Sequence, residues 1–445
     1  MSARSRIGIG LGICAMVSLV GSNVVFAQGP AAPAAGPTGT VQERLSTLEE
    51  KTNAEGLWKT LGFKLSGGIS ASYNHNFNNP NTNLSQLRTH DANTNSFTPN
   101  LAQVILEKPA MASGSTADRA GFRARLNFGP DARVSRARSN FLPGTDNNEL
   151  DFQELYAEYV APIGNGLKIQ AGKINTALGF ETFTSWENPN FSRTFGYNLS
   201  QAFTTTGVRF TYVINPMVTL LAAVNNGWDN IEDNNKGKMA EGAITLTLHP
   251  RFINYFYGSY AAEQSNGRGL GFGGTGTFAD PTAKRVILDY IGTFKATDAD
   301  TVVVEIYYGN ESNISTQSKS QNGRWNSGYL YYIHDFNDQT QPHAVSTRLR
   351  GGVFEDAGGV RTCTGAITFN GGNNTCANTP LAGGFGTGVQ QTIQEYTFTL
   401  QYKPTPALMT RTEFRHDISN KDVFLRGGRA VDNQSTLTFN VVYVF

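Results

Sequence analysis

The chain has 445 residues, of which 16% are charged, and a formal net charge of +1 at pH 7. Nucleic-acid binding requires a basic surplus that this chain lacks, so we expect no nucleic acid among its partners. Glycine (48 residues) and phenylalanine (28 residues) are frequent, whereas the mean hydropathy is −0.31. This balance fits a soluble all-β sandwich or β-helix, or a transmembrane barrel, whose alternating strands do not score as hydrophobic.

The N-terminus reads as a secretory signal peptide over residues 1–27. Arg4 and Arg6 supply the positive charge, the stretch 7–20 is apolar, and Val25-Phe26-Ala27 resembles a cleavage site. Because the apolar run is short and interrupted by glycine, a retained membrane helix is disfavoured. The chain is therefore expected to be exported.

Residues 28–57 are expected to lead from the signal peptide into the folded domain. The segment 28–40 is rich in proline, alanine and glycine, which predicts a linker. Val41, Leu45 and Leu48 then recur at the spacing of one helix face, which predicts a short amphipathic helix. Two roles stay open for this helix: it rests at the mouth of the domain, or it joins protomers as a small coiled coil.

From residue 58 onward the chain reads as a succession of strands with alternating polarity. In the last strand, Leu437, Phe439 and Val441 share one face, while the polar residues between them share the other. In GFRARLNFG (121–129), Arg123 and Arg125 lie opposite the apolar face. A soluble sandwich would have to turn every apolar face inward, whereas a barrel turns them toward lipid and encloses a polar lumen.

The links between strands alternate in length. Tight links occur at 162–166, 214–217, 249–251, 295–300 and 403–407, and long polar links at 78–96, 131–148, 176–202, 263–281, 311–324 and 355–390. Short periplasmic turns and long extracellular loops produce this alternation in bacterial barrels. We therefore predict an all-β fold, a transmembrane antiparallel β-barrel of about 16 strands over residues 58–445, wide enough for an aqueous channel.

The chain resembles the OmpL-like group of β-barrel porins from about residue 61 to residue 445. The resemblance rests on FTPNLAQVILEKP (97–109), GFRARLNFGPDA (121–132), ELYAEYVAPIGNGLKIQAGKINTALGFE (154–181), ENPNFSR (187–193), GVRFTY (207–212) and VNNGWDN (224–230). It implies a pore for small hydrophilic solutes, surrounded by lipid of a Gram-negative outer membrane; a homo-oligomer such as a trimer is compatible with it. The aromatic C-terminus at Phe445 resembles the signal that the barrel-assembly machinery recognises.

The lumen is the candidate functional site. Strand parity turns equal numbers of basic and acidic side chains inward: Arg123, Arg125, Arg209, Arg285, Arg348, Arg350, Arg411 and Arg415, and Glu107, Glu154, Glu158, Asp289, Glu305, Glu395, Glu413 and Asp417. These charges either pair along neighbouring strands and keep the wall wet, or create a transverse field that sorts solutes. Since several arginines gather near the closure of the barrel, we expect a modest preference for anions.

The long link 176–202 is a candidate constriction. A solvent-exposed loop tip would not need its aromatic residues Phe180, Phe183, Trp186, Phe191 and Phe195. We therefore expect the link to fold into the lumen as a constriction loop and narrow it, with the charged residues Glu181, Glu187 and Arg193 at the constriction and Trp186 in the same loop. A lid packed across the outer rim is the alternative.

No catalytic or cofactor-binding set emerges from the sequence. The six histidines are scattered, and the nearest approach to a hydrolase pair is His334 beside Asp335. We expect no cofactor, no metal and no enzymatic activity. A non-conducting surface protein and an outer-membrane hydrolase stay open as alternatives to a channel.

Two cysteines remain after removal of the signal peptide, Cys363 and Cys376. A pair of cysteines in an exported chain commonly forms a disulfide. We predict that the two are bonded and close a short loop on the extracellular side.

Overall fold

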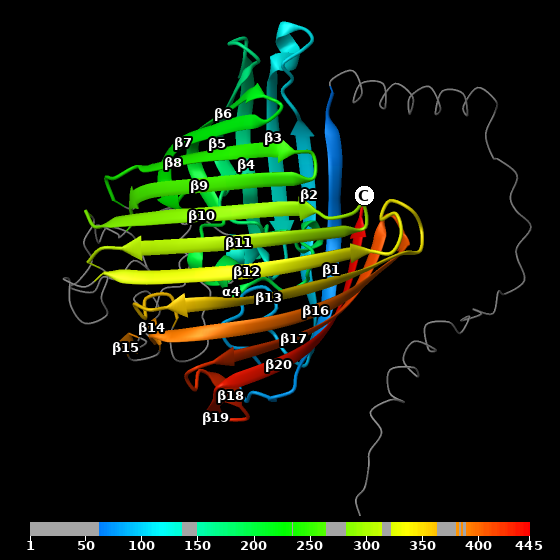
Figure 1. Ribbon diagram of the computed structural model, residues 1–445, viewed down its shortest axis with the longest axis vertical. Helices are drawn as coiled ribbons and strands as arrows, with labels where there is room; N and C mark the ends of the chain where they lie inside the picture. Colours follow the sequence, from blue (N-terminus) through cyan, green and yellow to red (C-terminus); the bar gives the residue numbers. More distant parts are fainter. Residues whose placement is uncertain are drawn as a thin grey trace, which may run out of the picture. The chain divides into compact units, whose positions relative to one another are not determined.

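Sixteen long strands close into one antiparallel barrel (Figure 1). Each pairs with its neighbours in chain order, and β1 pairs with β20 to complete the ring. The strands are β1 (Lys64–Asn76), β2 (Ser96–Lys108), β3 (Ala120–Phe128), β4 (Leu150–Ala161), β5 (Leu167–Asn175), β6 (Thr204–Asn215), β7 (Val218–Trp228), β8 (Met239–His249), β9 (Phe252–Ala262), β10 (Lys284–Lys295), β11 (Asp300–Glu311), β12 (Gly323–Asp335), β13 (Ala344–Asp356), β16 (Gln391–Thr405), β17 (Leu408–Ser419) and β20 (Asn433–Val444). The predicted all-β barrel and its strand number are confirmed.

This computed structural model describes residues 62–135, 149–233, 235–263, 282–313, 322–362, 380–381, 384–385 and 389–445. The predicted signal peptide, linker and amphipathic helix lie outside the described residues, as do Cys363 and Cys376. In the described part of the chain, no helix is long and apolar enough to cross a membrane.

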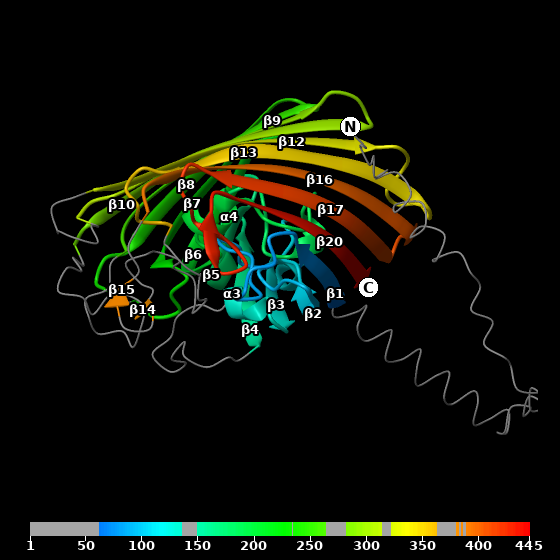
Figure 2. The same ribbon diagram turned by 90° about the horizontal axis from the view of Figure 1, so that it is seen from below.

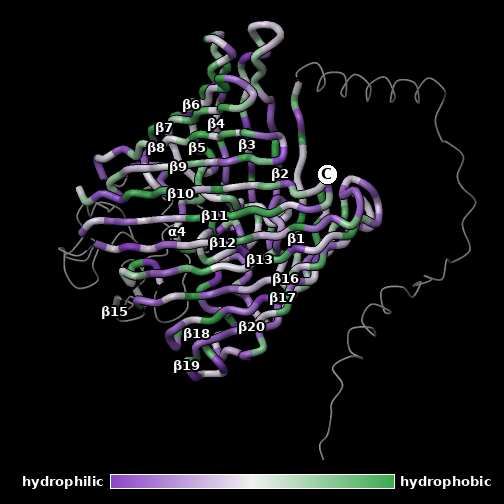
Figure 3. Tube along the Cα trace, in the orientation of Figure 1, coloured by the Kyte–Doolittle hydropathy of each residue, from purple (hydrophilic) through white to green (hydrophobic). Residues whose placement is uncertain are grey.

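Alternating burial along each strand follows from the period of two in the sequence. On β16, Glu395 and Thr397 are buried on the inside, whereas Tyr396 and Phe398 are exposed on the outside. Cross-strand register continues this division, since Phe398 pairs with Phe414 on β17. Figure 3 shows the resulting alternation of hydrophilic and hydrophobic residues along the strands. The charged and hydroxyl side chains of Glu395 and Thr397 on β16 are therefore turned to the lumen.

The smaller elements lie in the links. They are the 3-10 turns η1 (Thr116–Arg119) and η2 (Ser185–Glu187), the helices α3 (Ala132–Ser135) and α4 (Phe195–Ser200), and the hairpins β14 (Pro380–Leu381) with β15 (Gly384–Phe385) and β18 (Phe424–Arg426) with β19 (Arg429–Val431). Figure 2 shows α4 within the ring of strands. Apolar side chains from the links pack there against the wall, including Leu87, Phe195 and Leu199 beside Trp228 and Trp325.

Candidate functional site

The link between β5 and β6, residues 176–203, lies inside the barrel and is called the inner loop below. Its helix α4 begins after Thr194, whose hydroxyl accepts a hydrogen bond from the Tyr197 amide (3.0 Å). All six residues of α4 are buried. The expected position of this segment, inside the lumen rather than across the rim, therefore agrees with its packing against inward side chains.

Carboxylates on the barrel wall accept hydrogen bonds from backbone amides of the inner loop. Glu413 on β17 accepts from Phe191 (2.7 Å) and Ser192 (2.9 Å). Glu395 on β16 accepts from the Phe195 amide at the start of α4 (3.1 Å). Because hydrogen bonds to charged acceptors are stronger than neutral ones, these two acids fix the middle of the inner loop to the wall.

A second pair of acids holds the beginning of the inner loop. Asp289 on β10 accepts from the Gly179 amide (3.1 Å), and Glu305 on β11 accepts from the Phe180 amide (2.9 Å). The loop is thus bound to the wall near β10 and β11 and again near β16 and β17.

Three of the predicted wall arginines lie beneath the inner loop. Arg350 pairs with Glu395 (2.7 Å) and with Glu181 of the loop (2.9 Å). Arg415 also pairs with Glu395 (2.8 Å), and Arg411 donates to a loop carbonyl at Ser185 (2.9 Å). All three arginines are at most 2% exposed. They face the lumen as expected, but their charges are neutralised or covered by the loop.

Two residues expected at the constriction are instead buried within the inner loop. Glu181 accepts from the amide (2.7 Å) and hydroxyl (2.9 Å) of Thr194, and burial raises the pKa of Glu181. Arg193 donates to the carbonyls of Phe191 (2.6 Å) and Phe183. Both side chains therefore stabilise the loop through bonds within it.

Glu187 and Trp186 are the two predicted constriction residues that stay partly exposed. The Glu187 side chain is 35% exposed and pairs with Arg125 on β3 (3.3 Å). Trp186 is half-buried in η2. Glu187 therefore lies at the edge of the inner loop that faces β3, whereas Trp186 lies near Gly68 on β1.

A strip of alternating charges follows the wall from β2 to β5, opposite that edge. This charged strip comprises Glu107, Arg123, Arg125, Glu154, Glu158 and Lys168. Arg123 pairs with Glu107 (2.7 Å) and Glu154 (2.9 Å), Arg125 with Glu154 (2.9 Å), and Lys168 with Glu158 (2.8 Å). The side chains of Glu107, Arg123 and Lys168 are 24%, 23% and 40% exposed, unlike the buried arginines beneath the loop. Sequence reasoning missed Lys168, although its parity on β5 turns it inward.

Arg209, Arg285 and Arg348 also point inward but lie away from the charged strip. Arg285 pairs with Glu311 (2.7 Å) and Arg348 with Asp335 (2.9 Å). Arg209 donates to a backbone carbonyl at the end of β5. These predicted wall residues thus serve mainly as local partners of neighbouring groups.

The link between β1 and β2, residues 77–95, also enters the barrel, which the sequence analysis did not predict. Arg88 donates to Asp417 on β17 (3.1 Å) and pairs with Asp91. His90 lies among aromatic rings, 5.1 Å from Phe183 and 5.7 Å from Tyr197 between ring centroids. Burial lowers the pKa of His90 well below its ordinary value, so this imidazole is neutral. The first loop therefore packs against the inner loop.

His334 and Asp335, named above as the nearest approach to a hydrolase pair, do not bond to each other. His334 bonds to Asp300 on β11 (2.7 Å), beside Phe336 on the outer face, and Asp335 pairs with Arg348. Within the described ranges, no three His, Cys, Asp or Glu side chains come together as a metal site.

Comparisons with known proteins agree with this architecture. Residues 62–445 match the family model described as "Putative beta-barrel porin-2, OmpL-like". No curated protein matches the chain in sequence.

Several solved outer-membrane proteins share the fold. The anion-selective porin from Comamonas acidovorans is 7% identical (TM-score 0.52; 86% of this chain, 99% of that one). OprB of Pseudomonas putida is 10% identical (TM-score 0.52; 89% of this chain, 97% of that one). The channel DcaP of Acinetobacter baumannii is 11% identical (TM-score 0.51; 86% of this chain, 97% of that one). The chain therefore belongs to the OmpL-like family of β-barrel porins, channel proteins of the Gram-negative outer membrane.

Proposed function

We propose that solutes cross the barrel along the charged strip, between the β2–β5 wall and the edge of the inner loop. The observation that carries this proposal is the uneven exposure of the inward charges. Three residues of the strip, Glu107, Arg123 and Lys168, stay in contact with water, whereas Arg350, Arg411 and Arg415 are covered. The other three, Arg125, Glu154 and Glu158, are buried in the ion pairs of the strip. A barrel of this size has room for an aqueous channel beside its internal segments.

The charges of this path balance closely. The charged strip and Glu187 together hold four acidic and three basic side chains. Each base is paired with an acid, so the path is polar without a strong net field. Small hydrophilic solutes of either sign are the substrates that such a wall suits, with at most weak ion selectivity.

We further propose that the inner loop sets the size limit of the channel and that the chain performs no catalysis. Deleting residues 183–193 removes η2 and the loop's contacts with Glu413. Single-channel conductance and the largest permeant polymer should both increase in the deletion variant. Unchanged values in a correctly folded variant would contradict the assignment.

Two partner assignments stay predictions that rest on the resemblance to porins. Homo-oligomerisation is tested by chemical crosslinking in native membranes. Recognition by the barrel-assembly machinery is tested by removing Phe445, which should slow assembly of the barrel.

A further inference from the structure

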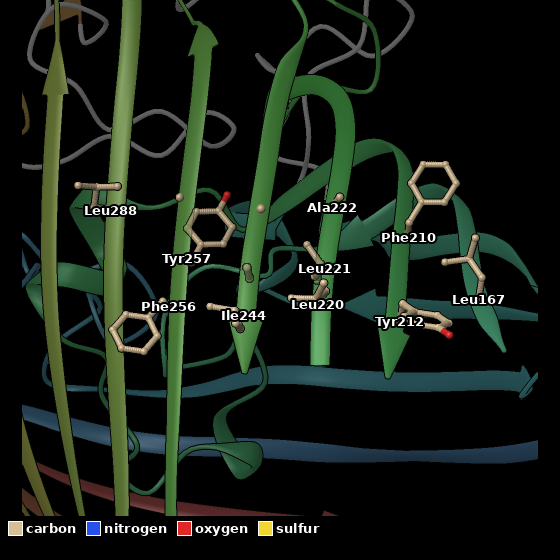
Figure 4. A pocket seen from close by; sticks show the side chains of 13 residues that line it. Leu167, Phe210, Tyr212, Leu220, Leu221, Ala222, Ile244, Phe256, Tyr257 and Leu288 are labelled. Atoms are coloured by element: carbon tan, nitrogen blue, oxygen red, sulfur yellow. The ribbon is translucent and has the colours of Figure 1, made fainter. Parts of the chain in front are cut away.

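An apolar hollow lies on the outer wall of the barrel, over β6 to β9 (Figure 4). Its volume is about 630 Å³. Cross-strand register explains how it forms, because Phe210, Ala222, Gly242 and Gly258 pair successively across four strands and Leu288 follows on β10. Three small residues in a row between two large ones leave a depression in a wall that faces lipid.

The barrel itself does not require glycine at the floor of this hollow. A Cβ atom added to Gly242 would meet nothing closer than 3.9 Å, and one added to Gly258 would be 3.5 Å from Leu288. Gly207 on β6 differs, since a Cβ atom there would lie 2.2 Å from the Val224 carbonyl. The backbone therefore explains Gly207, but leaves the two glycines of the hollow without an internal reason.

The hollow extends toward the periplasmic ends of its strands. The next row of its lining, Tyr212, Leu220, Ile244 and Phe256, lies two residues nearer the short turns. Tyr212 reaches the turn at 162–166, where its hydroxyl accepts from the Asn165 amide (3.4 Å). Tyrosine is enriched where the membrane meets water, so this end of the hollow is close to the periplasmic interface.

The chemistry of the lining selects hydrocarbon. The lining side chains are aliphatic or aromatic, and the Tyr212 hydroxyl is the one polar group that they offer to the hollow, since the hydroxyl of Tyr257 turns inward and bonds to Glu241. One water molecule occupies about 30 Å³ in the liquid, and a methylene group is of similar size. The hollow therefore has room for roughly twenty methylene groups, about one fatty acyl chain. A protein–protein interface takes about 20–30 residues from each side, more than the 13 residues of this lining.

We propose that the hollow binds one acyl chain of a phospholipid from the periplasmic leaflet. The small residues at 222, 242 and 258 admit the chain, and Phe210 and Leu288 flank it. The lipid head group lies near Tyr212, at the periplasmic interface. This site is on the outside of the barrel and is separate from the solute path.

The test is lipid retention by the full chain. The protein is refolded into vesicles of phosphatidylethanolamine and phosphatidylglycerol, extracted in mild detergent and examined by native mass spectrometry. We expect one phospholipid per barrel, reduced at least fivefold by Gly242→Leu, which fills the hollow. Gly328→Leu is the matched control, because Gly328 on β12 pairs with outward residues and a Cβ atom added there would meet nothing within 4 Å.

Several outcomes would overturn the proposal. They are equal lipid retention in the Gly242→Leu and control variants, displacement of the bound phospholipid by lipopolysaccharide, and a dimer that Gly242→Leu dissociates. Heat-modifiable gel mobility verifies that each barrel is folded. If Gly242→Leu does not fold, Ala222→Phe fills the same hollow from β7 and must give the same loss of lipid.

Discussion

Replacing Glu413 with alanine should release the middle of the inner loop from the wall. Glu413 accepts hydrogen bonds from the amides of Phe191 and Ser192 and from the Thr399 hydroxyl (2.7 Å), and it is buried. A hydrogen bond to a charged group contributes about 1.5–3 kcal/mol. Losing the two amide bonds therefore weakens the attachment by about 3–6 kcal/mol, and 1.4 kcal/mol changes an equilibrium constant about tenfold. The bound state of the loop should become roughly a hundredfold less favoured, or more.

Single-channel recording in planar bilayers detects this release. Glu413→Ala should show frequent transitions to a higher conductance and admit larger polyethylene glycols than the unaltered protein. Glu311→Ala is the matched control, because Glu311 is also a buried inward carboxylate but pairs with Arg285 on the neighbouring strand, away from the charged strip and the inner loop. If Glu413→Ala folds and conducts like the unaltered channel, its hydrogen bonds do not hold the loop in place.

Three further predictions concern charge, crosslinking and pH. Arg123→Ser should move the reversal potential in a salt gradient toward cation preference, whereas the buried Arg411→Ser should move it less; equal shifts would contradict the proposed path. Mass spectrometry of protein from the envelope should find Cys363 bonded to Cys376, a crosslink worth about 3 kcal/mol in the chain-entropy model, and free thiols would refute it. Asp131 lies in the link between β3 and β4, and burial raises its pKa to about 7. The folded protein therefore favours the protonated carboxyl. This stabilisation is fully present below the unfolded pKa of about 3.9 and is lost as pH rises through 7. Asp131→Asn should therefore raise the thermal midpoint more at pH 8 than at pH 5, and an equal gain at both would disprove this shift.

Strand alternation made most of the barrel predictable. Arg123, Arg125, Asp289 and Glu305 were expected on the inner face of their strands, and the structure has them there, on β3, β10 and β11. A period of two fixes which side chains turn inward, because one face must meet lipid and the other the lumen. Link lengths then predicted which ends of the strands are periplasmic.

Parity could not reveal what covers an inward side chain. Arg350 and Arg415 are inward, yet contacts with the inner loop or with Glu395 keep them from water. The first loop gave little signal, since residues 77–95 are mostly polar and, of the few apolar residues there, only Leu87 is fully buried. Its ion pair from Arg88 to Asp417 spans 329 residues and depends on closure of the whole ring.

Thiol modification during bilayer recording tests the proposed solute path most directly. Glu107→Cys introduces a thiol at an exposed position of the charged strip, and the unaltered protein treated with the same reagent is the control. We predict stepwise, long-lived conductance that falls when a water-soluble methanethiosulfonate is added to the Glu107→Cys channel. Silent bilayers from folded, heat-modifiable barrels, or conductance that modification leaves unchanged, would contradict it.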